Sequence, residues 1–105
     1  MQTVQIPFKN KFAAYLQQQD RSPKTIQGYM SDLEAFARWY YQSNGEKLTE
    51  KNLTPTDVRE YRQWLVGQDA APSTINRHLV SLRVFAQWIG FTIDVKGVEE
   101  QSLAP

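Results

Sequence analysis

Two segments of the chain repeat one another, and this repeat constrains the fold more than any other feature. Residues 23–40 read PKTIQGYMSDLEAFARWY and residues 72–89 read PSTINRHLVSLRVFAQWI. The segments are offset by 49 positions (72 minus 23) and share seven of 18 residues, whereas unrelated sequences would share roughly one. The same offset aligns three preceding pairs: Leu16 with Leu65, Gln19 with Gln68 and Asp20 with Asp69. The chain is therefore predicted to contain two copies of one unit.

Each repeated segment carries apolar residues at spacings of four and three, which places them on one side of a helix. These residues are Ile26, Met30, Leu33, Ala37 and Tyr40 in the first segment and Ile75, Leu79, Leu82, Ala86 and Ile89 in the second. Shorter apolar faces precede each segment, formed by Phe8, Phe12, Tyr15 and Leu16 and by Val58, Tyr61, Trp64 and Leu65. Two amphipathic helices with similar starts could also converge on similar residues. The matching Trp39 and Trp88 favour a true repeat.

Start and stop signals divide the chain into four expected helices. The first is expected at about residues 7–19, and the second from Pro23 to a stop at Asn44 and Gly45. The third is expected from Thr54 and Pro55 to Gly67, and the fourth from Pro72 or Ser73 to a stop at Gly90. The second begins after Ser22, a good N-cap, and ends before Gly45. The third begins after Thr54, whose side chain can form a capping box with Asp57, and ends at Gly67. The sequence therefore predicts an all-α fold, a four-helix bundle made of two helical hairpins.

The length of 105 residues fits one domain. Three Trp, five Tyr and five Phe residues supply large side chains for its core. We expect residues 1–90 to form this helical domain. Residues 91–105 contain glycine, proline and acidic residues without a sustained period, so we expect them to form a linker.

Several classes of protein are disfavoured by what the sequence lacks. There is no cysteine and only one histidine, His78, which falls within the last expected helix and suits a packing or surface role. We find no glycine-rich phosphate loop, no paired-carboxylate motif and no spacing of metal ligands, so we expect no metal and no cofactor. The N-terminal residues MQTVQIPFKN do not resemble a signal peptide, and no apolar run could span a membrane. These features suit a cytoplasmic protein that is not an enzyme by itself.

Charge is unevenly distributed, although the formal net charge is only +1. Residues 1–31 hold four basic side chains and a single acid, and residues 70–93 hold Arg77 and Arg83 and no acid. Such runs can simply be solvated helix surface. Lys24 and Arg77, however, both begin segments without nearby acids, which favours a role in binding an anion.

The starts of the second and fourth expected helices are rich in small polar and cationic residues. They are Lys24, Thr25, Gln27, Gly28 and Ser31 in one helix and Ser73, Thr74, Asn76, Arg77 and Ser81 in the other. Helix N-termini favour phosphate, and Gln, Asn and Arg can contact base edges. Gly28 could permit close approach of a phosphate or of a neighbouring helix. Capping and solvation are the alternative roles, and they suit Ser73 and Thr74 best. The nucleic-acid hypothesis requires both helix starts to face the same side.

Three stretches together resemble the N-terminal core-binding, SAM-like domain of tyrosine recombinases, the phage integrase class. They read SPKTIQGYMSDLEAFARWY, LTPTDVREYRQWL and PSTINRHLVSLRVFAQWI. The family pattern is a Ser or Thr cap, then Thr-Ile-x-x-Tyr, then Leu-x-x-Phe. Its positions here are Ser22, Thr25, Ile26, Tyr29, Leu33 and Phe36. The resemblance covers about residues 8 to 90.

This resemblance implies a four-helix domain that grips one face of a recombination half-site, with its second and fourth helices crossing the major groove. The implied partners are double-stranded DNA, a C-terminal catalytic domain of the same parent chain and neighbouring recombinase protomers on the DNA. The catalytic Arg, Lys, His and Tyr of the family belong to that second domain, expected after Pro105, so no catalytic residue is assigned here. The DNA-contact role maps onto Lys24, Thr25, Gly28, Ser73 and Arg77, with Gln27, Ser31 and Asn76 as further candidates. Many members are more basic than this chain, which predicts weak binding by the domain alone.

Two other classes of protein fit the same sequence. A helical protein-interaction module would expose an apolar patch, with Trp39 or Trp88 as its expected members. A small helix-turn-helix regulator would instead bind a specific operator as a dimer.

Overall fold

The computed structural model describes residues 6–90, which form four α-helices and no strand. The helices are α1 (Lys9–Gln18), α2 (Pro23–Asn44), α3 (Pro55–Gly67) and α4 (Pro72–Ile89). The all-α prediction is confirmed, and the expected bounds agree within two residues. The first helix starts later than predicted because Pro7 and Phe8 form a turn. None of the four helices is long and apolar enough to cross a membrane. The expected linker, residues 91–105, lies outside the described residues.

Local capping explains where the helices begin and end. The Ser22 hydroxyl oxygen accepts a hydrogen bond from the Thr25 backbone N–H at 3.2 Å. Thr54 and Asp57 form the predicted capping box, each side chain accepting from the other's backbone N–H. Gly45 ends α2 with a φ of +72°, a left-handed conformation that favours glycine.

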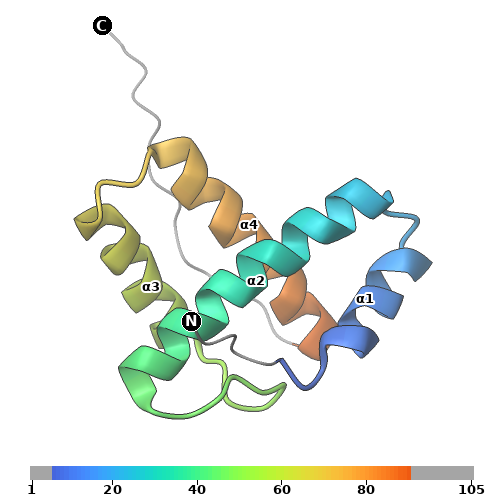
Figure 1. Cartoon of the computed structure of the whole chain (residues 1–105), viewed down its shortest axis with the longest axis horizontal. Helices are drawn as coiled ribbons and strands as arrows, with labels where there is room; N and C mark the ends of the chain where they lie inside the picture. Colours follow the sequence, from blue (N-terminus) through green and yellow to red (C-terminus); the bar gives the residue numbers. More distant parts are fainter. Residues whose placement is uncertain (1–5, 91–105) are drawn as a thin grey trace, which may run out of the picture.

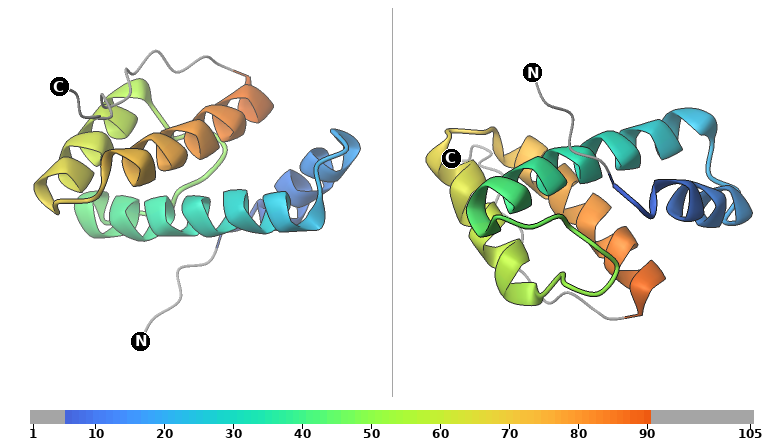
Figure 2. Two further views of the ribbon diagram at one scale, coloured as in Figure 1. Left: turned by 90° about the horizontal axis from the view of Figure 1, so that it is seen from above. Right: turned by 60° about the horizontal axis from the view of Figure 1, so that its bottom comes forward.

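The helices α2 and α4 cross near their middles, and α1 and α3 flank this crossing on opposite sides (Figure 1). Each outer helix packs against both crossing helices: α1 contacts α2 and α4, and α3 contacts α4 and α2. Each hairpin therefore supplies an outer helix that also packs against the other hairpin. Figure 2 shows this arrangement of the two hairpins from two further directions.

Two matching aromatic clusters fill the core on the two sides of the crossing. One contains Phe36, Trp39 and Tyr61, and the other contains Phe85, Trp88 and Phe12. The ring centroids of Phe36 and Tyr61 are 5.0 Å apart with planes at 80°. Those of Phe85 and Phe12 are 5.5 Å apart with planes at 79°. Each member of one cluster is 49 residues from its counterpart in the other, so the sequence repeat is also a repeat of packing.

The turns inside the two hairpins match as well. Asp20 and Asp69 adopt left-handed backbone conformations, with φ values of 59° and 60°. Aspartate tolerates this conformation better than most residues. The backbone N–H that follows each aspartate donates to the carbonyl of Leu16 in one hairpin (3.3 Å) and of Leu65 in the other (3.2 Å). The two hairpins are therefore built by the same local rules.

One expectation about tryptophan is wrong, and one alternative loses its expected residues. Trp64, expected on the core face of its helix, is 42% exposed, and its ring stacks on the buried Tyr61. Trp39, which a protein-interaction module would expose, is only 8% exposed, because its ring packs against Tyr61 of α3 with centroids 5.2 Å apart. Its counterpart Trp88 is partly buried. These two residues therefore do not form the apolar patch that the alternative of an interaction module requires.

We predict that Phe36→Ala and Phe85→Ala destabilise the domain to a similar extent, by about 3–5 kcal/mol each, because each opens a cavity in an equivalent cluster. Urea unfolding followed by circular dichroism measures the free energy of unfolding. Gln63→Ala, at an exposed position of α3, is the control and should stay within about 0.5 kcal/mol of wild type. A large loss in only one of the two phenylalanine variants would show that the clusters are not equivalent.

Candidate nucleic-acid interface

The starts of α2 and α4 reach the same side of the molecule. From the crossing, the N-terminal halves of both helices rise to the upper side of Figure 1 and splay apart. No other helix lies over them in the view from above in Figure 2. Nine residues separate Pro23 from Asp32, which lies at the crossing, so this half of α2 spans about 14 Å. The arrangement that a shared nucleic-acid face requires is present.

On α2, the five candidate residues are all exposed: Lys24, Thr25, Gln27, Gly28 and Ser31. The first turn contains no acid. The Thr25 hydroxyl accepts a hydrogen bond from the Ser22 hydroxyl at 3.0 Å. Within residues 6–90, a Cβ placed on Gly28 would meet no atom within 4 Å other than those of its own stretch of helix. Gly28 therefore does not serve close helix packing, and the space above it is open to a ligand.

On α4, the four candidate residues differ in exposure: Ser73 and Arg77 are exposed, and Thr74 and Asn76 are intermediate. The N-cap residue, Ala71, offers no side-chain cap, and the first turn contains no acid. The first N–H groups of α4 therefore lack the side-chain acceptor that Ser22 provides in α2.

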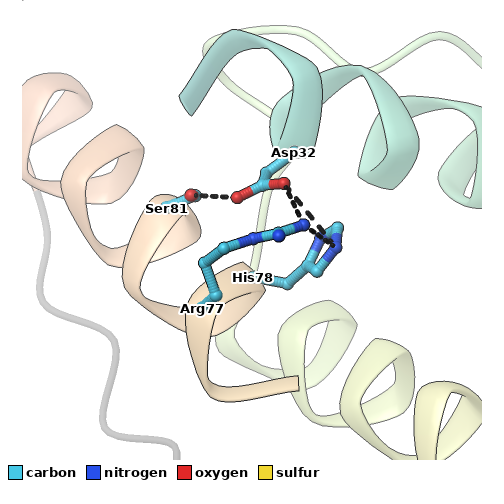
Figure 3. A network of polar contacts seen from close by, with 4 residues as sticks. All are labelled: Asp32, Arg77, His78 and Ser81. Carbon is cyan, nitrogen blue, oxygen red and sulfur yellow. Dashed lines mark hydrogen bonds and ion pairs between the residues drawn. The ribbon is translucent and has the colours of Figure 1, made fainter. Parts of the chain in front are cut away.

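Arg77 lies beside an acid, which corrects the expectation drawn from its segment. Its Nη2 atom donates to Oδ1 of Asp32 at 3.0 Å, across the contact between α4 and α2 (Figure 3). Ser81, expected among the polar residues that this helix offers to a ligand, is instead buried, because its hydroxyl donates to the other oxygen, Oδ2, at 2.7 Å. No acid lies close to Arg77 in the sequence, so none was expected beside it. The crossing of the two helices brings in Asp32, which is 45 positions away. Lys9 is paired similarly, with Glu34 at 3.2 Å.

The contact with Asp32 fixes Arg77 without burying it. Asp32 is 5% exposed, whereas the Arg77 side chain is 64% exposed. A guanidinium group has five N–H donors, so most of them remain available after Nη2 is engaged. Arg77 is therefore an exposed cation, fixed in position by Asp32, on the surface formed by the two helix starts. Asp32 was not among the residues expected at the site. The signal that could have found it is its position in the first repeat, which matches that of Ser81 in the second.

His78 is a buried packing residue, which is one of the two roles expected for it. Its Nε2 atom lies 3.2 Å from Nη2 of Arg77 and 3.6 Å from Oδ1 of Asp32. Among the described residues, Nδ1 has no hydrogen-bond partner. Burial lowers the pKa of His78 below its ordinary 6.5; the Asp32 charge opposes this shift and the Arg77 charge adds to it. The imidazole is therefore neutral at pH 7.

The two core tyrosines are poor nucleophiles at neutral pH. Burial, together with the nearby charges of Asp57 and Glu46, raises the pKa of Tyr40 to about 12. Burial, with a contribution from Asp32, raises the pKa of Tyr61 to about 12. An activated phenol requires the opposite shift. Both rings belong to the core.

Two crossed helical hairpins, with two helix starts on a common polar face, define a small all-helical domain of the SAM-like class. A family model described as phage integrase, N-terminal SAM-like domain, matches residues 10–89. The chain belongs to this family. No curated protein and no solved structure matches it.

We predict that His78 makes the domain less stable in mild acid. The unfolded chain binds a proton near pH 6.5 and the folded domain binds it only at lower pH. The stabilisation that neutral His78 gives to the folded domain is therefore fully present above pH 6.5. It is lost as the pH falls from there through the lowered pKa of the folded state. Thermal melts at a series of pH values from neutral to acidic should show a smaller fall in melting temperature for His78→Gln than for wild type. Parallel declines would exclude His78 as the cause.

We predict that Gly28→Ala raises the free energy of unfolding by up to about 1 kcal/mol, because alanine is the better helix former and the added Cβ meets open space. Gly45→Ala is the matched control and should destabilise, because its φ of +72° strains any residue with a side chain. Urea unfolding measures both changes. A loss of stability in Gly28→Ala would mean that the site is not open.

Proposed function

We propose that this domain is the DNA-gripping arm of a site-specific tyrosine recombinase, which holds one face of a recombination half-site with the N-terminal halves of α2 and α4. Membership of the phage integrase N-terminal family supports a role in recombination. The single observation that carries the DNA-binding role is that the two helix starts, where Lys24 and Arg77 are exposed, reach the same side of the molecule (Figure 1).

The charge on this face suits a polyanion. Lys24 is exposed in the first turn of α2, and Arg77 presents a held guanidinium group from α4. The first turns of both helices contain no acid, and their partial positive charge adds to these cations. We assign Lys24 and Arg77 to phosphate groups. Such contacts supply most of the affinity and little sequence preference.

The remaining candidates complete the proposed interface. Small hydroxyl side chains suit phosphate oxygens, and this set comprises Thr25, Ser31, Ser73 and Thr74. The absence of a side chain at Gly28 leaves open space beside α2 that a DNA phosphate can enter. Gln27 and Asn76, with amides that can pair with adenine, are the candidates for contact with bases.

The domain alone should bind DNA weakly. The formal net charge is only +1, and the positive charge of Arg77 is partly neutralised by its ion pair with Asp32. We expect a dissociation constant in the nonspecific range of about 10⁻⁴ to 10⁻⁶ M. Strong binding then requires the partners that the family resemblance implies. These are a C-terminal catalytic domain of the same parent chain, reached through residues 91–105 and closing a clamp around the duplex, and neighbouring protomers on the DNA.

We predict that Lys24→Ala reduces the salt dependence of DNA binding by about one unit in the slope of log K against log salt, because one phosphate contact is lost. Fluorescence anisotropy with a generic labelled duplex gives this slope. Lys51→Ala removes the same charge from the exposed loop between α2 and α3 and should leave the slope unchanged. An unchanged slope in Lys24→Ala would remove Lys24 from the interface.

An NMR titration with the same duplex separates the proposal from its alternatives. Shifts that cluster at residues 22–31 and 72–81 support the recombinase arm. A complete absence of shifts favours a protein-interaction module, for which the described residues offer four exposed large apolar side chains: Tyr41, Trp64, Val66 and Val80. Tight, sequence-dependent binding as a dimer favours a helix-turn-helix regulator.

A further inference from the structure

The offset of 49 residues relates the polar face of the domain as well as its core. Asp32 and Ser81 occupy equivalent positions in the two repeats, and they are joined by a 2.7 Å hydrogen bond. Two equivalent residues in contact must lie beside the axis that relates them. A pseudo-two-fold axis therefore passes between Asp32 and Ser81 and emerges between the splayed halves of α2 and α4 (Figures 1 and 3).

The candidate DNA-contact residues fall into pairs about this axis. The pairs are Lys24 with Ser73, Thr25 with Thr74, Gln27 with Asn76, Gly28 with Arg77 and Ser31 with Val80. Gly28 and Arg77 each lie four residues before the contact at the axis, or about 6 Å along their helices. The N-terminal halves of α2 and α4, hereafter the two arms, thus offer equivalent positions at equal distances from the axis.

A DNA duplex has two-fold symmetry of its own, because its antiparallel backbones are related by axes perpendicular to the duplex. Proteins with two-fold symmetry commonly align their axis with such a dyad. We propose that the pseudo-two-fold axis of this single domain coincides with a dyad of the duplex, so that the α2 arm contacts one strand and the α4 arm contacts the other. This inference rests on the proposed DNA-binding function and adds to it the way the duplex is held.

The arms are equivalent in position but not in charge. Arg77 gives the α4 arm an exposed guanidinium group held by Asp32. The α2 arm has Gly28 at the matching position, where no other part of the described chain comes within 4 Å of an added Cβ. There is therefore room for a longer side chain at residue 28. If the axes coincide, an arginine moved to that position meets the second strand as Arg77 meets the first.

Moving the arginine across the axis tests the proposal. The full chain is titrated against a generic labelled duplex over a series of salt concentrations. Arg77→Gln should reduce the slope by about 0.9, while its amide N–H can still donate to Asp32. Adding Gly28→Arg to Arg77→Gln should restore the wild-type slope, because the two strands of a generic duplex are equivalent. Adding Gln42→Arg instead, at an exposed position near the C-terminal end of α2, restores the same net charge away from the arms and should not restore the slope.

Restoration by Gly28→Arg but not by Gln42→Arg supports the shared axis. Failure of Gly28→Arg, when Arg77→Gln has lowered the slope, overturns the shared axis and leaves the proposed function intact. Equal restoration by both additions overturns it too, since net charge alone would then suffice. If the wild-type chain shows no salt-dependent binding, the proposed function fails, and this inference fails with it.

A second variant covers the case in which Arg77→Gln does not fold, since Asp32 would lose its charged partner. Gly28→Arg in the otherwise wild-type chain leaves Asp32 and Arg77 in place. It should increase the slope by about 0.9, whereas Gln42→Arg alone should not. Circular dichroism melts establish that each variant is folded at the temperature of the titration. An unchanged slope in a folded Gly28→Arg variant overturns the proposal.

Discussion

The arrangement of the four helices depends on a buried carboxylate at the crossing of α2 and α4. Asp32 is 5% exposed, and a charge in such a place is costly unless it is paired and hydrogen-bonded. Ser81 and Arg77, both from α4, donate to its two oxygens. These bonds form only when the two helices meet in one register, whereas apolar side chains alone would tolerate small shifts. The positions of both arms, and so of the whole polar face, follow from this contact.

The nonpolar core surrounds the polar contact symmetrically. The Phe36 and Phe85 clusters lie on its two sides, and each joins an outer helix to a crossing helix of the other hairpin. The repeat is well preserved in these clusters and in the hairpin turns, where packing and backbone geometry allow few substitutions. The repeat diverges on the exposed arms, where Arg77 of α4 is the counterpart of Gly28 of α2. The two copies thus share a structural role and differ in the charge that they offer to a ligand.

Most of the fold could be predicted because its signals are local. The Thr54 capping box and the glycine at Gly45 act within a few residues and set the helix limits. The candidate residues of both arms were found because they lie off the apolar stripe at a helix start. Asp32 could not be found in this way, since it is a polar residue that becomes buried only through a second helix. The same reason explains Trp39, which α3 covers, and Trp64, which no helix covers on its outer side.

By itself, the sequence determined four helices, their limits, their apolar faces and the repetition of one hairpin. Each of these is encoded by residues within a turn or two of one another, or by the comparison of one segment with another. Only the tertiary structure decided that Asp32 meets its counterpart Ser81, that Arg77 is held by an acid 45 residues away, and that both arms share one face. Such contacts depend on the angle and register at which two helices cross. Side chains from all four helices set that geometry together, so no local period contains it.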